Sequence, residues 1–98
     1  MIKHVVCYKF KKEEKKNLPE AVALLKGMQG RVPEVVNVQA HADELGSERS
    51  FDLILEVWLE SFAALERYQA DGYHAGVIKP YMHSKYEKSV SIDFTLEE

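Results

Sequence analysis

The segment from residue 51 to residue 59 alternates so strictly that it restricts the chain to folds containing a sheet. The opposite row of its side chains is mixed, and includes Ile54 and Trp58 beside Asp52 and Glu56. A period of two predicts a β-strand. Because apolar side chains stand on both of its faces, we expect a sheet that is covered on both sides. The continuous apolar row is Phe51, Leu53, Leu55, Val57 and Leu59.

Three further segments alternate in a similar way, namely residues 2–10, 35–42 and 89–94. Each has the length and the β-branched or aromatic content that are typical of strands. The charged stretch 43–50 reads as an exposed connection, so residues 35–42 and 51–59 are predicted to form an antiparallel hairpin across a long loop. The rows that share a face are His4, Val6, Tyr8 and Phe10; Val36, Val38 and Ala40; and Val90, Ile92 and Phe94.

A first helix is predicted between Asn17, which is a plausible cap, and Gly30, which can end it in a left-handed conformation. Pro19 fits the first turn of a helix, where its missing N–H costs nothing. Pro33 prevents the helix from resuming. The inward stripe is predicted to be Ala21, Leu24, Leu25 and Met28.

A second helix begins after Ser61, a good N-cap, and is interrupted at Asp71-Gly72. Its predicted stripe is Phe62, Leu65 and Tyr68. Residues 74–85 read as a further helical segment, bent or broken near Pro80.

The order β-α-β-β-α-(α)-β predicts one α+β domain over residues 1–98, a ferredoxin-like four-stranded antiparallel sheet with helices on one face. The other face still presents Ile54 and Trp58, or Val5 and Cys7, depending on the strand register. An uncovered apolar sheet face is an association surface. We therefore expect a homodimer through the open sheet face that closes into an α+β barrel, with Trp58 as an interface anchor.

Charge and composition narrow the partners. The net charge of −3 argues against nucleic acid, and no apolar run is long enough for a membrane span. Because we find no signal peptide, the chain is expected to be cytoplasmic. Cys7 is the only cysteine and reads as a small core residue. The basic run, read as a solvated surface or as an anion-binding patch, is Lys9, Lys11, Lys12, Lys15 and Lys16.

Several stretches, in order along nearly the whole chain, resemble the stress-responsive A/B barrel (Dabb) family. They are the opening MIKHVVCYKF, the helix exit VPEV, the segment RSFDLILEVWLESFAALERYQ and the ending SVSIDF. The resemblance implies a dimeric α+β barrel. Many bacterial members of that family have no assigned activity.

A plant branch of the family resembles this chain and includes a polyketide cyclase that needs no metal or cofactor. The resemblance implies Tyr68 and His74 as its catalytic pair and His4 as a pocket residue. In that pair, histidine would remove a proton and tyrosine would donate to the enolate oxygen. Two positions depart from the branch, because Asp71 and Leu53 stand where it has histidines.

The candidate site therefore contains Tyr68 and His74 as catalytic residues. The same two residues also fit a structural interpretation, with His74 at a helix start and Tyr68 as a core aromatic. His41 and His83 are expected at the surface. No metal spacing and no cofactor motif is present. The predicted ligand-binding residues are His4, Tyr8, Phe10 and Leu53.

Three functions remain open at this point. The first is a barrel protein of unassigned or no catalytic activity, whose role depends on its stability and assembly. The second is a module that binds a small apolar molecule between the sheet and the helices. The third is a cofactor-independent enzyme, either a polyketide-type cyclase or a heme-free monooxygenase, the latter by fold analogy alone.

Overall fold

The computed structural model describes residues 1–97. Its 3-10 helix is labelled η1 and its π-helical turn η2. The elements are β1 (Ile2–Phe10), η1 (Lys12–Asn17), α1 (Leu18–Lys26), β2 (Asn37–Ala42), β3 (Leu53–Leu59), α2 (Phe62–Ala70), η2 (His74–Ile78), α3 (Lys79–Lys85) and β4 (Tyr86–Thr95). None of the helices in this range is long and apolar enough to cross a membrane.

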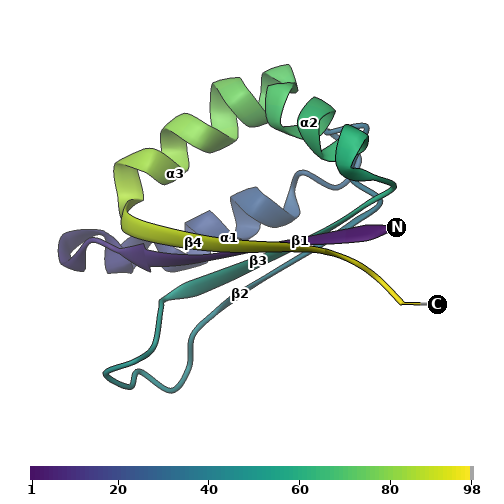
Figure 1. Ribbon diagram of the computed structural model, residues 1–98. Helices are drawn as coiled ribbons and strands as arrows, with labels where there is room; N and C mark the ends of the chain where they lie inside the picture. The colour runs from purple at the N-terminus through teal and green to yellow at the C-terminus, as the bar shows by residue number, and fades with distance from the viewer. Residues whose placement is uncertain (98) are drawn as a thin grey trace.

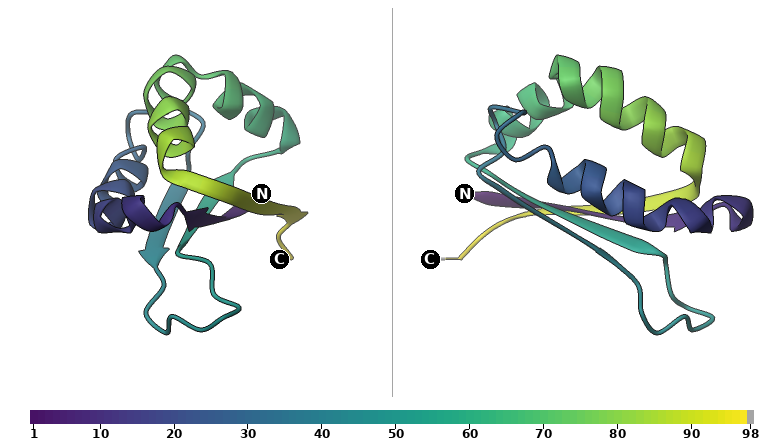
Figure 2. Two further views of the ribbon diagram at one scale, coloured as in Figure 1. Left: turned by 90° about the vertical axis from the view of Figure 1, so that its left-hand side faces the viewer. Right: turned by 180° about the vertical axis from the view of Figure 1, so that it is seen from behind.

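The four strands form one sheet in the order β2-β3-β1-β4, and every neighbouring pair is antiparallel. All three α-helices lie over the same face, with α2 and α3 forming an arch above it (Figures 1 and 2). The predicted ferredoxin-like arrangement is confirmed. The opposite face of the sheet has no covering element within residues 1–97.

The core lies between the covered face and the helices. The predicted apolar row is confirmed over β3, since Leu53, Leu55, Val57 and Leu59 are at most 2% exposed, whereas Phe51 lies before the strand and is only half-buried. It packs with inward residues of β1, with Ala21 and Leu25 of α1, and with Met28 in the turn after that helix, and the last three are fully buried. Burial of such side chains is the main source of stability in a domain this small.

The strand register settles which residues share the uncovered face. Cys7 lies opposite Ile54 on one side and Val90 on the other, and Val5 lies opposite Ile92. Both sets that the sequence left as alternatives therefore stand on this face together. The prediction that Cys7 is a core residue is wrong, because its side chain is only half-buried and lies away from the helices. Burial, followed by Glu56, raises the pKa of its thiol.

Strand β4 has its polarity reversed relative to the rest of the sheet. Its apolar residues Val90, Ile92 and Phe94 point to the uncovered face and are 48%, 68% and 40% exposed. Its polar residues lie opposite the inward row of β1, and Asp93 is the partner of His4 in the register. The polar residues of the covered face therefore gather along this edge and at His4 on the neighbouring strand. The polar residues concerned are Ser89, Ser91 and Asp93.

The predicted N-terminal cap is confirmed for α2 but not for α1. Ser61 caps α2, since its hydroxyl accepts a hydrogen bond from the backbone N–H of Ala64 at 3.1 Å. Asn17 stands at the cap position of α1 but makes no capping bond. Its side-chain amide instead donates a hydrogen bond to the carboxylate of Glu14, in η1, at 2.7 Å.

Two other helix predictions need correction. Helix α1 ends at Lys26, well before Gly30, although Gly30 does adopt a positive φ of 83° in the turn that follows. In α2, Phe62 is 50% exposed, and the inward positions are Ala64 and Tyr68. The stripe of α2 is thus rotated away from Phe62.

The segment 74–85 stays helical through Pro80, but its hydrogen bonding changes there. Proline has no N–H, and its ring clashes with the carbonyl four residues earlier in an α-helix. The wider π turn of η2 comes directly before α3, where Pro80 sits in the first turn. The helical hydrogen bonding therefore changes at this point, but the helix is not broken. Single π turns are often found at functional sites.

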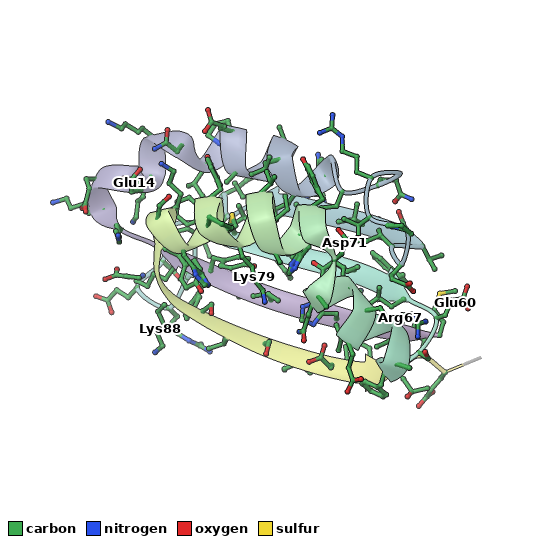
Figure 3. The ribbon with its side chains drawn as sticks, turned by 90° about the horizontal axis from the view of Figure 1, so that it is seen from above. Glu14, Glu60, Arg67, Asp71, Lys79 and Lys88 are labelled. Atoms are coloured by element: carbon green, nitrogen blue, oxygen red, sulfur yellow. The ribbon has the colours of Figure 1, made fainter. Side chains whose placement is uncertain are left out.

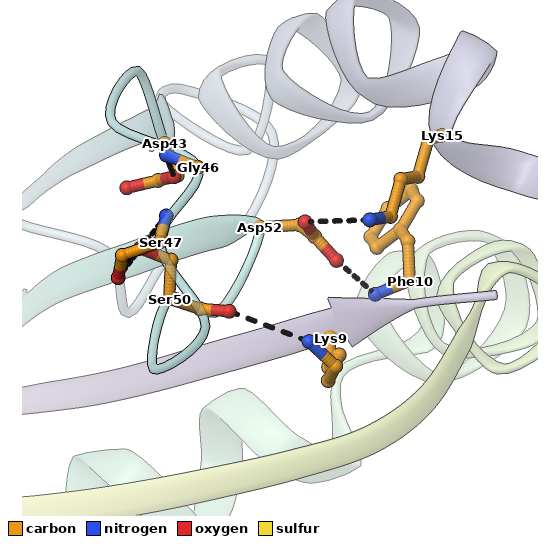
Figure 4. Close-up of polar contacts among 8 residues, drawn as sticks. All are labelled: Lys9, Phe10, Lys15, Asp43, Gly46, Ser47, Ser50 and Asp52. Atoms are coloured by element: carbon orange, nitrogen blue, oxygen red, sulfur yellow. Dashed lines mark hydrogen bonds and ion pairs between the residues drawn. The ribbon is translucent and has the colours of Figure 1, made fainter. Parts of the chain in front are cut away.

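The 43–52 connection and the basic run hold each other at the end of the sheet (Figure 4). Asp52 accepts a hydrogen bond from the backbone N–H of Phe10 at 2.8 Å and lies 3.6 Å from the ammonium of Lys15. Lys9 donates to the carbonyl of Ser50 at 3.4 Å. Part of the basic run thus binds loop and strand ends, and is not simply solvated.

Candidate functional site between β4 and α3

A cavity of about 210 Å³ lies between the covered face of the sheet and the segment formed by α2, η2 and α3. The polar edge of β4 forms one wall and α3 the other. It brings together four of the six residues predicted for the site: His4, Tyr8, Tyr68 and His74. The remaining lining residues are Val6, Leu55, Gln69, Ile78, Lys79, Met82, His83, Tyr86, Ser89 and Ser91.

The position of His74 is supported by Asp71, one of the two residues that differ from the plant branch. The carboxylate of Asp71 accepts hydrogen bonds from the backbone N–H groups of Tyr73 at 2.9 Å and His74 at 3.2 Å. Asp71 therefore caps the helical turn that begins at residue 72 and leads into η2, as Asp does at helix N-termini. The substitution of histidine by aspartate at this position supports the local backbone and supplies no cavity residue.

His74 is 8% exposed, and its Nδ1 atom is buried without a hydrogen-bond partner among residues 1–97. Burial lowers the pKa of His74 to about 4, with a further contribution from the charge of Lys79. The ring is therefore neutral at pH 7. A buried polar atom without a partner costs free energy, and in native proteins such an atom calls for an explanation, for example a catalytic role, an ion or a water molecule.

Tyr68 packs beside His74, with their ring centroids 4.3 Å apart. It is 1% exposed, and burial raises the pKa of its hydroxyl far above the ordinary value, so the group remains protonated. Its hydroxyl donates to the sulfur of Met28 at 3.7 Å, toward α1. Because thioether sulfur is a weak acceptor, a ligand oxygen would compete well for this donor.

His4 lies on the other side of Tyr68, with its ring centroid 5.9 Å away in an edge-on arrangement. The Nδ1 atom of His4 is paired with the carboxylate of Asp93. A carboxylate at Nδ1 fixes the ring so that Nε2 is the free nitrogen. This pairing is what orients His4, and Asp93 was not identified from the sequence.

Tyr8 and Tyr86 form the end of the cavity away from His4, with their ring centroids 5.1 Å apart. Burial raises the pKa of Tyr8, so its hydroxyl also remains protonated. His83 packs against Tyr86 at 5.6 Å between ring centroids. The prediction that His83 lies at the surface is correct for its exposure, but the side chain also lines the cavity.

The other two predicted ligand-binding residues lie elsewhere. Phe10 is 1% exposed in the core and lines no part of this cavity. Leu53 lines a separate hollow beside the 43–52 connection, with Cys7, His41 and Phe51. Within residues 1–97 no group of three or more His, Cys, Asp or Glu side chains is placed to hold a metal ion.

The site residues that the sequence did not reveal come mostly from β4 and α3. Ser89 and Ser91 alternate with the apolar row of β4, so that alternation was the available signal. Assigning them to a cavity required the register of β4 on β1. Lys79 and Met82 required the π turn, which sets the rotation of α3.

These features define a small α+β protein with a ferredoxin-like sheet and a histidine-lined cavity beneath its helices. The model of the stress responsive A/B barrel domain (Dabb) matches residues 2–96, and the chain belongs to this family. The family predicted from the sequence is therefore confirmed. Among curated proteins, none matches the chain.

Solved structures with this fold come from plants and bacteria. An Arabidopsis thaliana protein is 18% identical with a TM-score of 0.85, covering 100% of this chain and 97% of that one. A dimeric ferredoxin-like protein of unknown function from Thermobifida fusca is 17% identical with a TM-score of 0.83, covering 97% and 90%. A hydroxynitrile lyase from Passiflora edulis is 18% identical with a TM-score of 0.83, covering 99% and 94%. These similarities show the shared fold.

Proposed function

We propose that this Dabb protein binds a small molecule in the cavity between β4 and α3. The observation that carries the proposal is His74, which lies at the wall of that cavity and whose buried Nδ1 atom has no hydrogen-bond partner within residues 1–97. A ligand that hydrogen-bonds there would remove the free-energy cost of leaving the atom unpaired, about 1–3 kcal/mol.

The size and lining of the cavity indicate the kind of ligand. An apolar cavity of about 150 Å³ holds benzene, so a cavity of about 210 Å³ fits one six-membered ring with small substituents. Val6, Leu55, Ile78 and Met82 supply apolar walls. His74 and Tyr68 supply polar contacts at the buried end. A compact molecule that combines an apolar ring with polar substituents, including a hydroxyl group, satisfies both.

A thermal-shift screen of phenol and substituted phenols tests this proposal on three proteins: wild type, His74→Ala, and His41→Ala as the matched control. His41 is an exposed histidine on β2, outside this cavity. We expect phenols to stabilise wild type and His41→Ala, and to stabilise His74→Ala less. If no compound stabilises wild type, or if His74→Ala responds as wild type does, the proposal is wrong.

We also propose that the protein is a homodimer formed through the uncovered face of the sheet. The exposed row Val90, Ile92 and Phe94 supports this, as does Trp58, which is half-buried on the same face beside Lys3. A second copy of this chain presents the same row, so a two-fold axis would bury both. The dimeric Thermobifida fusca protein of the same fold adds support.

A second candidate function is catalysis without a cofactor, favoured by the pairing of His4 with Asp93. A histidine oriented by a carboxylate at Nδ1 can take a proton through Nε2. The cyclase suggested by the sequence also needs a base next to a carbonyl, a role that the resemblance implies for His74. A hydroxynitrile lyase would use the same kind of base. The base would take the hydroxyl proton of the hydroxynitrile, and the carbon–cyanide bond would break as a carbonyl forms. The base would then return the proton to the departing cyanide.

Cyanide release from an aromatic hydroxynitrile, measured for wild type and His4→Gln, tests the lyase form of this candidate. We expect release by wild type above the buffer rate and a loss of at least about 100-fold in His4→Gln, the usual size of a general-base contribution. No release by wild type removes the lyase. The monooxygenase alternative and the cytoplasmic location stay predictions from the sequence.

A further inference from the structure

The charges around the cavity differ from those of the chain as a whole. The chain carries 16 acidic and 13 basic residues, for a net charge of −3. Within residues 1–97, however, the cavity is lined by one lysine and three histidines and by no Asp or Glu. A site that lacks carboxylates in an acidic protein is electrostatically suited to a negatively charged ligand.

One ammonium group stands at the rim. Lys79 is exposed on α3 and lines the cavity, with the exposed side chain of His83 one helical turn further along. Figure 3 shows Lys79 on the side of α3 that faces β4. Lys3, Lys15 and Lys85 each pair with a carboxylate, whereas Lys79 forms no ion pair within residues 1–97.

The opposite side of the rim supplies neutral donors. Ser89 and Ser91 project from β4 toward the cavity, and both are exposed. Their hydroxyls form no hydrogen bond to another side chain within residues 1–97. A carboxylate oxygen accepts from hydroxyl and ammonium groups alike. The rim therefore has donors on both sides, while the buried end has His74.

We propose that the ligand is a compact organic anion whose carboxylate lies at the rim between Lys79 and the serines of β4. Its apolar body occupies the middle of the cavity, and a hydroxyl at its far end donates to Nδ1 of His74. This inference rests on the proposed binding function and names the class of ligand for that same cavity.

Calorimetric titration with 4-hydroxybenzoate and its neutral analogue 4-hydroxybenzamide tests the inference. The two probes share the ring and the hydroxyl and differ in charge. The proteins are wild type, Lys79→Gln, and Lys12→Gln, which removes one charge from an exposed lysine of η1 outside the cavity. Circular dichroism checks that each variant is folded.

We expect wild type to bind the acid about fivefold more tightly than the amide at low salt, the upper range for an exposed ion pair. Lys79→Gln should reduce the preference to twofold or less, and Lys12→Gln should retain it. Added salt should weaken the preference in wild type.

Equal binding of acid and amide by wild type would overturn the anion inference and leave the binding function intact. An equal effect of Lys12→Gln and Lys79→Gln would overturn it too, because the preference would then reflect net charge alone. Failure of both probes and of every phenol to bind would instead overturn the proposed function itself.

Discussion

The two faces of strand β4 show how one segment can serve two surfaces. On the covered face, Ser89 and Ser91 line the cavity that His74 also lines. On the uncovered face, Val90 and Ile92 expose apolar surface to solvent. A strand that only closed a core would have the opposite polarity, with apolar residues under the helices. Strand β4 therefore contributes to a cavity on one side and to an association surface on the other.

The largest effect is expected from a substitution on the uncovered face of β4, compared with one on its covered face. Ile92→Asp places a carboxylate in the middle of the proposed dimer interface, where desolvation of an unpaired charge costs several kcal/mol. We expect the dissociation constant of the dimer to rise by at least about 100-fold. Ser91→Asp, one residue away on the covered face, should leave assembly unchanged. Sedimentation velocity at micromolar concentration measures both, and a dimer that survives Ile92→Asp would exclude this face.

Truncation of the packed side chains should cost more than truncation on the uncovered face. Leu59 is fully buried under the helices, so Leu59→Ala should lower the free energy of unfolding by about 2–5 kcal/mol. Val90→Ala, measured in the Ile92→Asp monomer, should cost less than about 1 kcal/mol. Urea unfolding compares the two. Similar costs would mean that the outer row is packed within a single chain.

The depressed pKa of His74 predicts a pH dependence of stability. Its pKa is about 4 in the folded protein against 6.5 for the free side chain, so the unfolded chain binds the extra proton between these values. The stability that neutral His74 provides is therefore complete above pH 6.5 and is lost as the pH falls toward 4.

The loss should reach about 3 kcal/mol at pH 4. Urea unfolding of wild type and His74→Gln at pH 7, 5.5 and 4 measures it as the change in their difference. If the difference between the two proteins stays constant with pH, His74 is not held neutral by burial. His41→Gln, which changes an exposed histidine, serves as the control.

A smaller effect is expected from the pair that orients His4. Asp93→Ala removes a charge-assisted bond at a partly exposed site and should cost about 1–2 kcal/mol, with Asp93→Asn intermediate because it keeps an acceptor. Nitrogen NMR of the imidazoles should show the proton of His4 on Nδ1 in wild type. An unchanged His4 spectrum in Asp93→Ala would mean that the carboxylate does not orient the ring.

Much of the fold could be predicted because the periodicity of the apolar residues is local information. The row of β3 and the cap at Ser61 are set by neighbouring residues, and both are confirmed. Predictions that depended on distant partners were less accurate. The inward stripe of α2 excludes Phe62, because tertiary packing sets the rotation of that helix.

The residues of the candidate site likewise divide into those that could be predicted from the sequence and those that depend on the register of the strands. His4, Tyr8, Tyr68 and His74 were identified through residue type and family resemblance, and the fold brings them to one cavity. Asp93 and Ser91 were missed because their side of β4 becomes meaningful only once its register on β1 is known. Leu53 and Phe10 share the inward alternation of their strands but lie beyond the end of the cavity.

The central claim is that β4 separates a ligand cavity from an association surface, and methyl NMR with 4-hydroxybenzoate and phenol as probes tests it most directly. The methyl groups of Ile78 and Met82 line the cavity, while those of Ile54 and Ile92 belong to the uncovered face. We expect the probes to shift Ile78 and Met82 and to leave Ile54 and Ile92 unchanged. Shifts at Ile54 and Ile92 without shifts at Ile78 and Met82 would contradict the account.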